Sequence, residues 1–220
     1  MNFADKAINY FLKVQKPAGF LSGIEIRNPY KQKTTMRLVK EFYLKFFNDN
    51  NQRLFVLGIN PGRFGGGLTG IAFTDPVALR NLCGIDNNLG NNKELSSKFI
   101  YRMIDAYGGV ELFYSKVFMS ALYPLALVKE GKNHNYYDTK DLAASLKDEI
   151  IKSIKSRIKF GARRDKVIIL GKKNAKYFSS INDEYNFFEN ISALEHPRYI
   201  MQYKLKKIDF YISKYIEALD

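Results

Sequence analysis

The chain has 220 residues, of which 46% are apolar, and a formal net charge of +13. This length and composition predict one domain with a sizeable core, spanning residues 1–220. The single cysteine, Cys83, excludes an intramolecular disulfide and any metal or iron–sulfur site built from several cysteines. No apolar run reaches the ~18 residues that a membrane helix needs, and the N-terminus lacks the layout of a signal peptide. We therefore expect a cytoplasmic protein that makes no membrane contact.

The positive charge is concentrated in one part of the chain. Residues 152–176 hold ten basic residues and one acidic residue. A domain this basic often binds a polyanion, so the segment is a candidate surface for tracking phosphates. A solvated helix face would have the same composition, and the charge alone does not separate the two interpretations.

Helical and strand patterns alternate along the chain. Apolar residues recur at spacings of three and four over 3–15 and 34–48, which predicts two helices. The apolar run RLFVLGI (53–59) is typical of a strand that is buried on both faces. Further helices are predicted over 76–83, 95–107, from Asp138 or Thr139 to Ile158, over 172–180 and over 203–219, where Leu205 is expected to be buried. Further strands are predicted over 116–125, 165–171 and 190–196.

This alternation predicts a three-layer α/β/α sandwich with a central four-stranded, mainly parallel sheet. In such sheets ligands bind beyond the carboxyl ends of the strands. Here those ends lie at residues 58–67, at 120–124, at Gly171 and at His196. We therefore expect the functional site where these four segments meet.

The first strand runs into a glycine-rich loop, GINPGRFGGG, at residues 58–67 (the glycine loop). Glycine permits tight turns and lets a ligand approach the main chain closely. The loop is neither a Walker motif nor a dinucleotide-binding G-x-G-x-x-G motif that opens a helix. By itself it predicts either a tight strand-to-loop crossing or a site for an anionic or planar ligand.

The two histidines of the chain have different surroundings. His134 lies in a polar segment, KEGKNHNYYD, and is expected to be solvated. His196 follows the last predicted strand, so it should lie at the same edge of the sheet as Asn60. A lone histidine is often a structural hydrogen-bonding residue, but its position opposite the glycine loop favours a catalytic role.

Two motifs together resemble a known family. GINPGRFGGGLTGIAF (58–73), followed downstream by His196-Pro197, resembles the uracil-DNA glycosylase superfamily. It is most similar to the single-strand-selective monofunctional uracil-DNA glycosylases and their bacterial relatives. The strands KVFMSALYPL and KVIILG occupy the places of two further family strands, and the order fits from about residue 28 to residue 200. The absence of further cysteines excludes the branches that carry an iron–sulfur cluster.

The resemblance implies a role for each matching residue. Asn60 would orient the attacking water, and His196 would stabilise the oxygen of the departing base. Phe73 would stack on the base, which has to leave the DNA helix to be reached. Gly62 stands where other branches have a bulky aromatic residue, which suggests tolerance of pyrimidines modified at C5. The implied base-binding residues are Ile59, Gly62, Arg63, Phe64, Phe73, Ser120 and Ala121.

The segment after His196 corresponds to the loop that the family inserts into DNA. The implied DNA-binding and wedge residues are Pro197, Arg198, Tyr199, Ile200 and Met201, together with Lys172 and Lys173. The alternative for Ile200 and Met201 is that they start the last helix and pack inward.

The family's uracil-reading asparagine aligns with Ala121, with Ser120 beside it. This departure weakens selection for uracil, so xanthine and hypoxanthine also become candidate substrates. The resemblance implies a bacterial, monomeric, monofunctional DNA glycosylase of base excision repair, without cofactor or metal and with DNA as its partner. Two alternatives remain from the residues: a non-catalytic nucleic-acid-binding protein of the same fold, and a nucleotide- or phosphate-binding enzyme that uses the turn at Gly171, Lys172 and Lys173.

Overall fold

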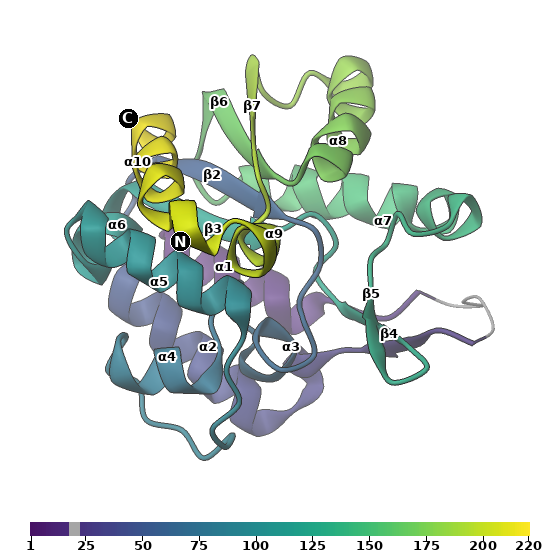
Figure 1. The fold of residues 1–220 in the computed structure, drawn as a ribbon. Helices are drawn as coiled ribbons and strands as arrows, with labels where there is room; N and C mark the ends of the chain where they lie inside the picture. The colour runs from purple at the N-terminus through teal and green to yellow at the C-terminus, as the bar shows by residue number, and fades with distance from the viewer. Residues whose placement is uncertain (18–22) are drawn as a thin grey trace.

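The computed structural model describes residues 1–17 and 23–220, and Figure 1 shows their arrangement. The strands are β1 (Glu25–Arg27), β2 (Arg53–Gly58), β3 (Val117–Ala121), β4 (Ala126–Lys129), β5 (Lys132–His134), β6 (Ala162–Leu170) and β7 (Asn190–Leu194). The α-helices are α1 (Phe3–Lys13), α2 (Lys33–Phe46), α3 (Gly66–Thr69), α4 (Pro76–Asn81), α5 (Leu95–Tyr107), α6 (Val110–Lys116), α7 (Lys140–Ile158), α8 (Lys172–Tyr185), α9 (Pro197–Tyr203) and α10 (Ile208–Leu219). Two short 3₁₀ helices, η1 (Pro29–Lys31) and η2 (Leu205–Lys207), complete the described elements.

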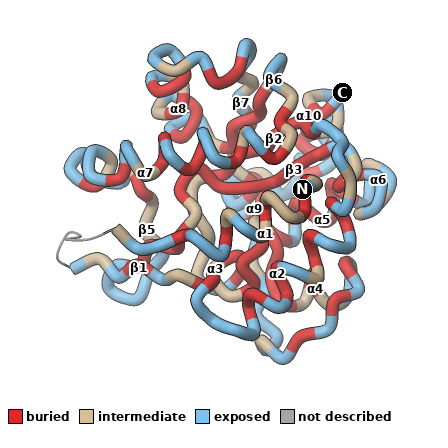
Figure 2. Tube along the Cα trace, turned by 180° about the vertical axis from the view of Figure 1, so that it is seen from behind, coloured by how far each residue is buried: buried red, intermediate tan, exposed pale blue. Residues whose placement is uncertain are grey.

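The central sheet has four strands in the order β3-β2-β6-β7, and every neighbouring pair is parallel. Every residue of β2 and β3 is buried, as the uninterrupted apolar runs predicted, and Figure 2 shows this in red. Gly58 at the end of β2 pairs with Ala121 at the end of β3, and Leu170 pairs with Leu194. The register therefore brings the four carboxyl ends to one edge, and the predicted fold class is confirmed.

Helices cover both faces of this sheet. Phe118 on β3 packs against Phe3 of α1 and Phe47 at the end of α2, with ring centroids 5.3 and 6.0 Å away. Helix α7 contributes to the same face through the buried Arg157, described below. Helices α5, α9 and α10 pack on one another and lie in front of the sheet in Figure 1, with α1 and α7 behind it. The result is the three-layer arrangement predicted from the alternation.

A second, antiparallel sheet lies beside the main one, in the strand order β1-β4-β5. The sequence prediction missed it. The run predicted as one strand over 116–125 ends at Ala121, and the chain then turns through Pro124 into β4. The strands of this small sheet have three or four residues each, too few to produce a clear periodic pattern.

The predicted C-terminal helix over 203–219 is also interrupted. Helix α9 ends at Tyr203, η2 follows, and α10 begins at Ile208. Leu205 is 53% exposed rather than buried, because it lies in the 3₁₀ turn between the two helices. Within the described residues no helix is both long enough and apolar enough to span a bilayer.

Arg157 of α7 is 1% exposed and anchors the end of β3. Its Nη1 donates to Ser120 Oγ at 2.6 Å and to the carbonyl oxygen of Ala121 at 2.5 Å. Its Nη2 donates to the carbonyl oxygen of Leu122 at 3.0 Å. These bonds satisfy buried acceptors that no further strand reaches, and they fix the chain where it leaves the sheet.

Candidate active site

A pocket of about 720 Å³ opens at the carboxyl edge of the parallel sheet. The glycine loop forms one wall, and His196 with the start of α9 forms another. Of the residues proposed from the sequence, the pocket is lined by Ile59, Asn60, Gly62, Arg63, Phe64, Phe73, Ala121, His196, Arg198 and Tyr199. The fold therefore brings together residues that are up to about 140 positions apart in the sequence.

The first glycine of the loop makes room for an aromatic ring. A Cβ atom at Gly58 would lie 2.4 Å from Cζ of Phe73, so only glycine allows this ring to pack against the end of β2. Phe73 has a left-handed backbone, with φ of 57°, which is unusual for a bulky residue. Its ring centroid is 6.0 Å from that of His196. Phe73 is therefore held beside His196, with part of its side chain in the pocket.

Asn60 lies between the main sheet and the small one. Its Nδ2 donates to the carbonyl oxygen of His134 at 3.0 Å, and its Oδ1 accepts from the backbone N–H of Tyr136 at 3.2 Å. These two bonds fix the plane and orientation of the amide. An amide oxygen has two lone pairs, so Oδ1 retains one with which to accept a hydrogen bond from water.

The sequence interpretation did not include the segment that holds Asn60. His134 was expected to be solvated, but its side chain is only 16% exposed and its Nε2 is buried without a partner among the described residues. The hydroxyl of Tyr136 donates to Oδ1 of the buried Asn174 at 2.6 Å, which links this segment to α8. The polar sequence around His134 concealed this role because its backbone, rather than its side chains, contacts Asn60.

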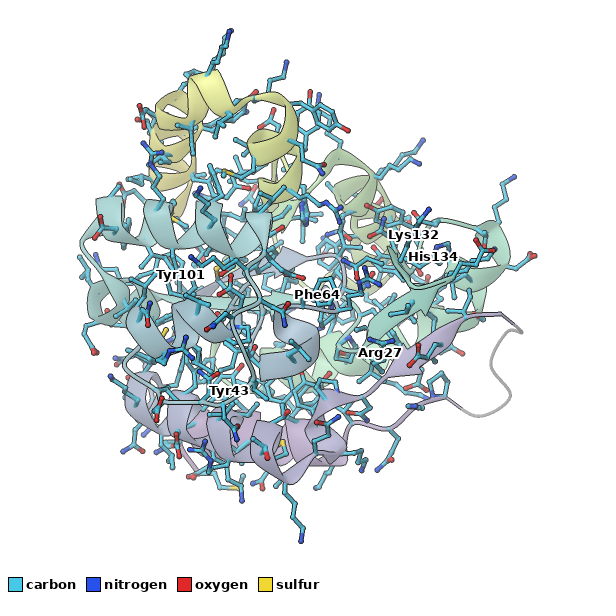
Figure 3. The ribbon with its side chains drawn as sticks, turned by 60° about the horizontal axis from the view of Figure 1, so that its bottom comes forward. Arg27, Tyr43, Phe64, Tyr101, Lys132 and His134 are labelled. Carbon is cyan, nitrogen blue, oxygen red and sulfur yellow. The ribbon has the colours of Figure 1, made fainter. Side chains whose placement is uncertain are left out.

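Strand β5 lies directly beside the glycine loop. The backbone N–H of Arg63 donates to Asn133 Oδ1 at 3.0 Å. Figure 3 labels Phe64 on the loop and Lys132 and His134 on β5. The N–H of Arg63 is thus already bonded within the protein and does not point free into the pocket.

His196 caps the start of α9 and is held in one tautomer. Its Nδ1 accepts from the backbone N–H of Arg198 at 3.2 Å, so in the neutral ring the proton resides on Nε2. Burial, assisted by the nearby charge of Arg198, lowers the pKa of His196 to about 4. At neutral pH the side chain is therefore an uncharged hydrogen-bond donor through Nε2.

Gly62 makes room for a neighbouring side chain rather than for a ligand. A Cβ atom at Gly62 would lie 2.3 Å from Oε1 of Glu94, and one at Gly65 would lie 2.3 Å from Oε2. Oε1 also accepts from the backbone N–H of Phe64 at 3.3 Å. The expected open space for substituents at C5 is thus filled by Glu94, which no sequence pattern indicated.

The neighbours Ser120 and Ala121 point to opposite sides of β3. Ala121 lines the pocket, whereas Ser120 Oγ accepts from Arg157 on the other face of the sheet. The proposal that Ser120 reads the base is therefore wrong, because successive side chains of a strand alternate between faces. Strand β3 presents only a methyl group to the pocket.

The segment after His196 is the helix α9 rather than an open loop. Pro197 is its first residue, and Ile200 and Met201 are 0% and 8% exposed. These three residues do not line the pocket, so Ile200 and Met201 pack inward and cannot act as a wedge in this conformation. Arg198 and Tyr199 remain on the outer face, where Tyr199 is 42% exposed.

Lys172 and Lys173 begin α8 and are both exposed, outside the pocket. Gly171, which precedes them, lies close to His196: a Cβ atom there would be 3.6 Å from that of His196. The two lysines thus follow a residue that packs beside His196, but they do not line the pocket.

A pocket with a fixed amide, an uncharged imidazole and an aromatic ring suits an enzyme that hydrolyses a bond to a planar, uncharged group. The model of the uracil DNA glycosylase superfamily matches residues 44–220, and the chain belongs to that superfamily. It is accordingly a DNA N-glycosylase, a hydrolase of DNA repair whose substrate is DNA.

One solved structure specifies the likeness further. The crystal structure of wild-type SMUG2 from Pedobacter heparinus shares 45% sequence identity with this chain and superposes with a TM-score of 0.95. The match covers 99% of this chain and 97% of that one. A comparison with curated proteins finds no match.

Proposed function

We propose that this glycosylase hydrolyses the N-glycosidic bond of deaminated bases, with uracil, hypoxanthine and xanthine as its substrate class. The observation that carries the proposal is the methyl group of Ala121 in the pocket, where a side-chain amide would impose the edge of a single base. With no such group on β3, the pocket relies on stacking against Phe73 and on a few hydrogen bonds. Stacking is tolerant of base identity, which supports a substrate range that includes purines.

In the proposed mechanism the target base leaves the DNA stack and enters the pocket against Phe73. Asn60 Oδ1 accepts a hydrogen bond from the attacking water and orients it towards C1′ of the sugar. As the glycosidic bond breaks, negative charge builds on the base, and Nε2–H of His196 donates to its oxygen. Arg198 and Tyr199 on the outer face of α9 would occupy the gap that the flipped base leaves.

The test is base release from single- and double-stranded oligonucleotides that carry uracil, hypoxanthine or xanthine. We expect alkali-labile abasic sites from all three, and none from oligonucleotides with the parent bases cytosine, adenine and guanine. Borohydride should trap no covalent complex, because water rather than a lysine amine attacks the sugar. Formation of product from uracil alone would refute the broad substrate class, and absence of product from every oligonucleotide would refute the activity.

The low pKa of His196 predicts how the rate depends on pH. Because His196 is neutral above about pH 4, its titration should leave the single-turnover rate unchanged between about pH 6 and pH 8. The rate should fall only on the acid side, where protonation of Nδ1 removes the acceptor for the N–H of Arg198 that orients the ring. A catalytic imidazolium would give the opposite result, a rate that falls as the pH rises through neutrality.

Folding has to be followed in the same pH range. A histidine whose pKa is lowered by folding binds fewer protons in the native state than in the unfolded state. Stability therefore falls as the pH drops from about 6.5, the ordinary pKa of histidine, towards about 4, the pKa of His196 in the fold. Circular dichroism at each pH separates unfolding from loss of activity. In the variant His196→Gln, any fall in rate at acid pH that persists in the folded protein must arise from the titration of another group, such as Glu94.

A further inference from the structure

Glu94 is the single acidic residue among those that line the pocket, whose rim carries Arg63, Lys93, Lys132 and Arg198. It precedes α5, and its backbone N–H donates to Oδ2 of the buried Asp75 at 3.0 Å. An acid in a pocket that faces DNA opposes binding of phosphates. Its presence therefore requires an explanation beyond the general electrostatics of the site.

The position of the Glu94 carboxyl group explains why an acidic residue lies in this pocket. The two oxygens of Glu94 occupy the places that side chains at Gly62 and Gly65 would take, 2.3 Å from a Cβ atom at either glycine. Gly62 and Gly65 of the glycine loop thus lie at the two positions where a larger residue would clash with Glu94. The wall of the pocket at this point is therefore a side chain from the segment just before α5, rather than the glycine loop itself.

The carboxyl group is held in this place by the loop. Oε1 accepts from the N–H of Phe64, and burial raises the pKa of Glu94. Asp75 raises this pKa further, whereas the N–H groups of Phe64 and Gly65 and the charge of Arg198 lower it. The side chain is therefore anchored on one side but is not packed into the core, since it remains partly exposed.

We propose that Glu94 is a specificity-determining residue, whose carboxyl group sets the size of base that the pocket admits by filling the space above Gly62 and Gly65. The proposal rests on the glycosylase function given above. A pocket discriminates by one extra carbon with a factor of about 10 to 200 in rate, so a carboxyl group at the wall is large enough to decide between bases. Removing it should open the pocket to larger bases.

The experiment compares Glu94→Ala, which removes the carboxyl group, with Glu94→Gln, which keeps its volume. Single-turnover rates are measured on oligonucleotides carrying uracil, 5-methyluracil, 5-hydroxymethyluracil or hypoxanthine. The readout is the rate on each larger base divided by the rate on uracil with the same variant. This ratio cancels any general loss of activity, and a melting curve for each variant confirms that it is folded.

We expect Glu94→Ala to raise the ratio by about tenfold or more for at least one larger base. Glu94→Gln should keep the order of the bases seen in the wild type. The matched control is Glu189→Ala, which removes an exposed glutamate just before β7, at the opposite edge of the sheet from the pocket, and should match the wild type.

Two outcomes would overturn the proposal: ratios in Glu94→Ala that equal those of the wild type for every base, or a shift in Glu94→Gln as large as that in Glu94→Ala. The second result would assign the effect to charge rather than to size. Failure of the proposed function is distinguishable from both, because the wild type would then release no base from any of these oligonucleotides.

Discussion

Replacing Asn60 by alanine should lower the single-turnover rate of uracil release by about 10²- to 10³-fold. This is the usual loss when one preorganised polar group of an active site is removed. Asn60 fits that role because the backbone groups of His134 and Tyr136 fix its amide, while one lone pair of Oδ1 can still accept a hydrogen bond from water. Affinity for DNA should change little, since contacts to phosphates rather than to the water dominate binding.

The matched control for this variant is Asn133→Ala. Asn133 also lines the pocket, but within the described part of the chain its side-chain amide bonds to the N–H of Arg63 alone. We expect a much smaller loss of rate from it. Base release is measured well below the melting temperature, because Asn60→Ala also leaves two backbone groups without their partner. A rate near that of the wild type in folded Asn60→Ala would contradict the assigned role.

Replacing Arg157 by methionine should destabilise the fold by about 3 kcal/mol or more. The variant fills similar space but leaves Ser120 Oγ and the carbonyl oxygens of Ala121 and Leu122 without their buried donor. Each such group costs about 1 to 3 kcal/mol when left unpaired. For a chain of this size the melting temperature should fall by about 6 to 12 °C, which thermal unfolding followed by circular dichroism measures.

Arg163→Met is the control for this stability prediction. Arg163 lies on β6, is 42% exposed and pairs with Asp165 on the surface. Surface ion pairs of this kind contribute about 0 to 1 kcal/mol, so its melting temperature should stay close to that of the wild type. Equal losses in the two variants would show that the bonds from Arg157 to β3 do not stabilise the protein.

The sequence predicted the central sheet well because burial on both faces leaves a strong pattern. After its first residue, Arg53, the run RLFVLGI has no polar residue on either side of the strand, and glycine or proline marks where each run stops. Because β3 is buried on both faces, the sequence did not indicate which way Ser120 and Ala121 point. In a strand without alternation, nothing in the sequence says which of two neighbours faces the pocket, and the prediction included both.

The features that were missed depend on contacts between distant segments. The bonds of Asn60 lead to backbone groups 74 and 76 residues away, and backbone groups carry no sequence signal. Glu94 reaches a loop 30 residues earlier, and its sequence neighbourhood is an ordinary polar stretch before a helix. The family resemblance implies a loop after His196, although the proline there is also favoured in the first turn of a helix.

Both bonds that orient the Asn60 amide lead to the backbone of residues at or just after β5, where the small antiparallel sheet ends. Proteins open locally with free energies that range from near zero up to that of complete unfolding, and short peripheral strands open most easily. A brief separation of β5 from β4 would release the amide while the parallel sheet stayed intact. The proposed activity therefore depends on β5 staying paired with β4, and we expect heat to reduce the rate before the parallel sheet melts.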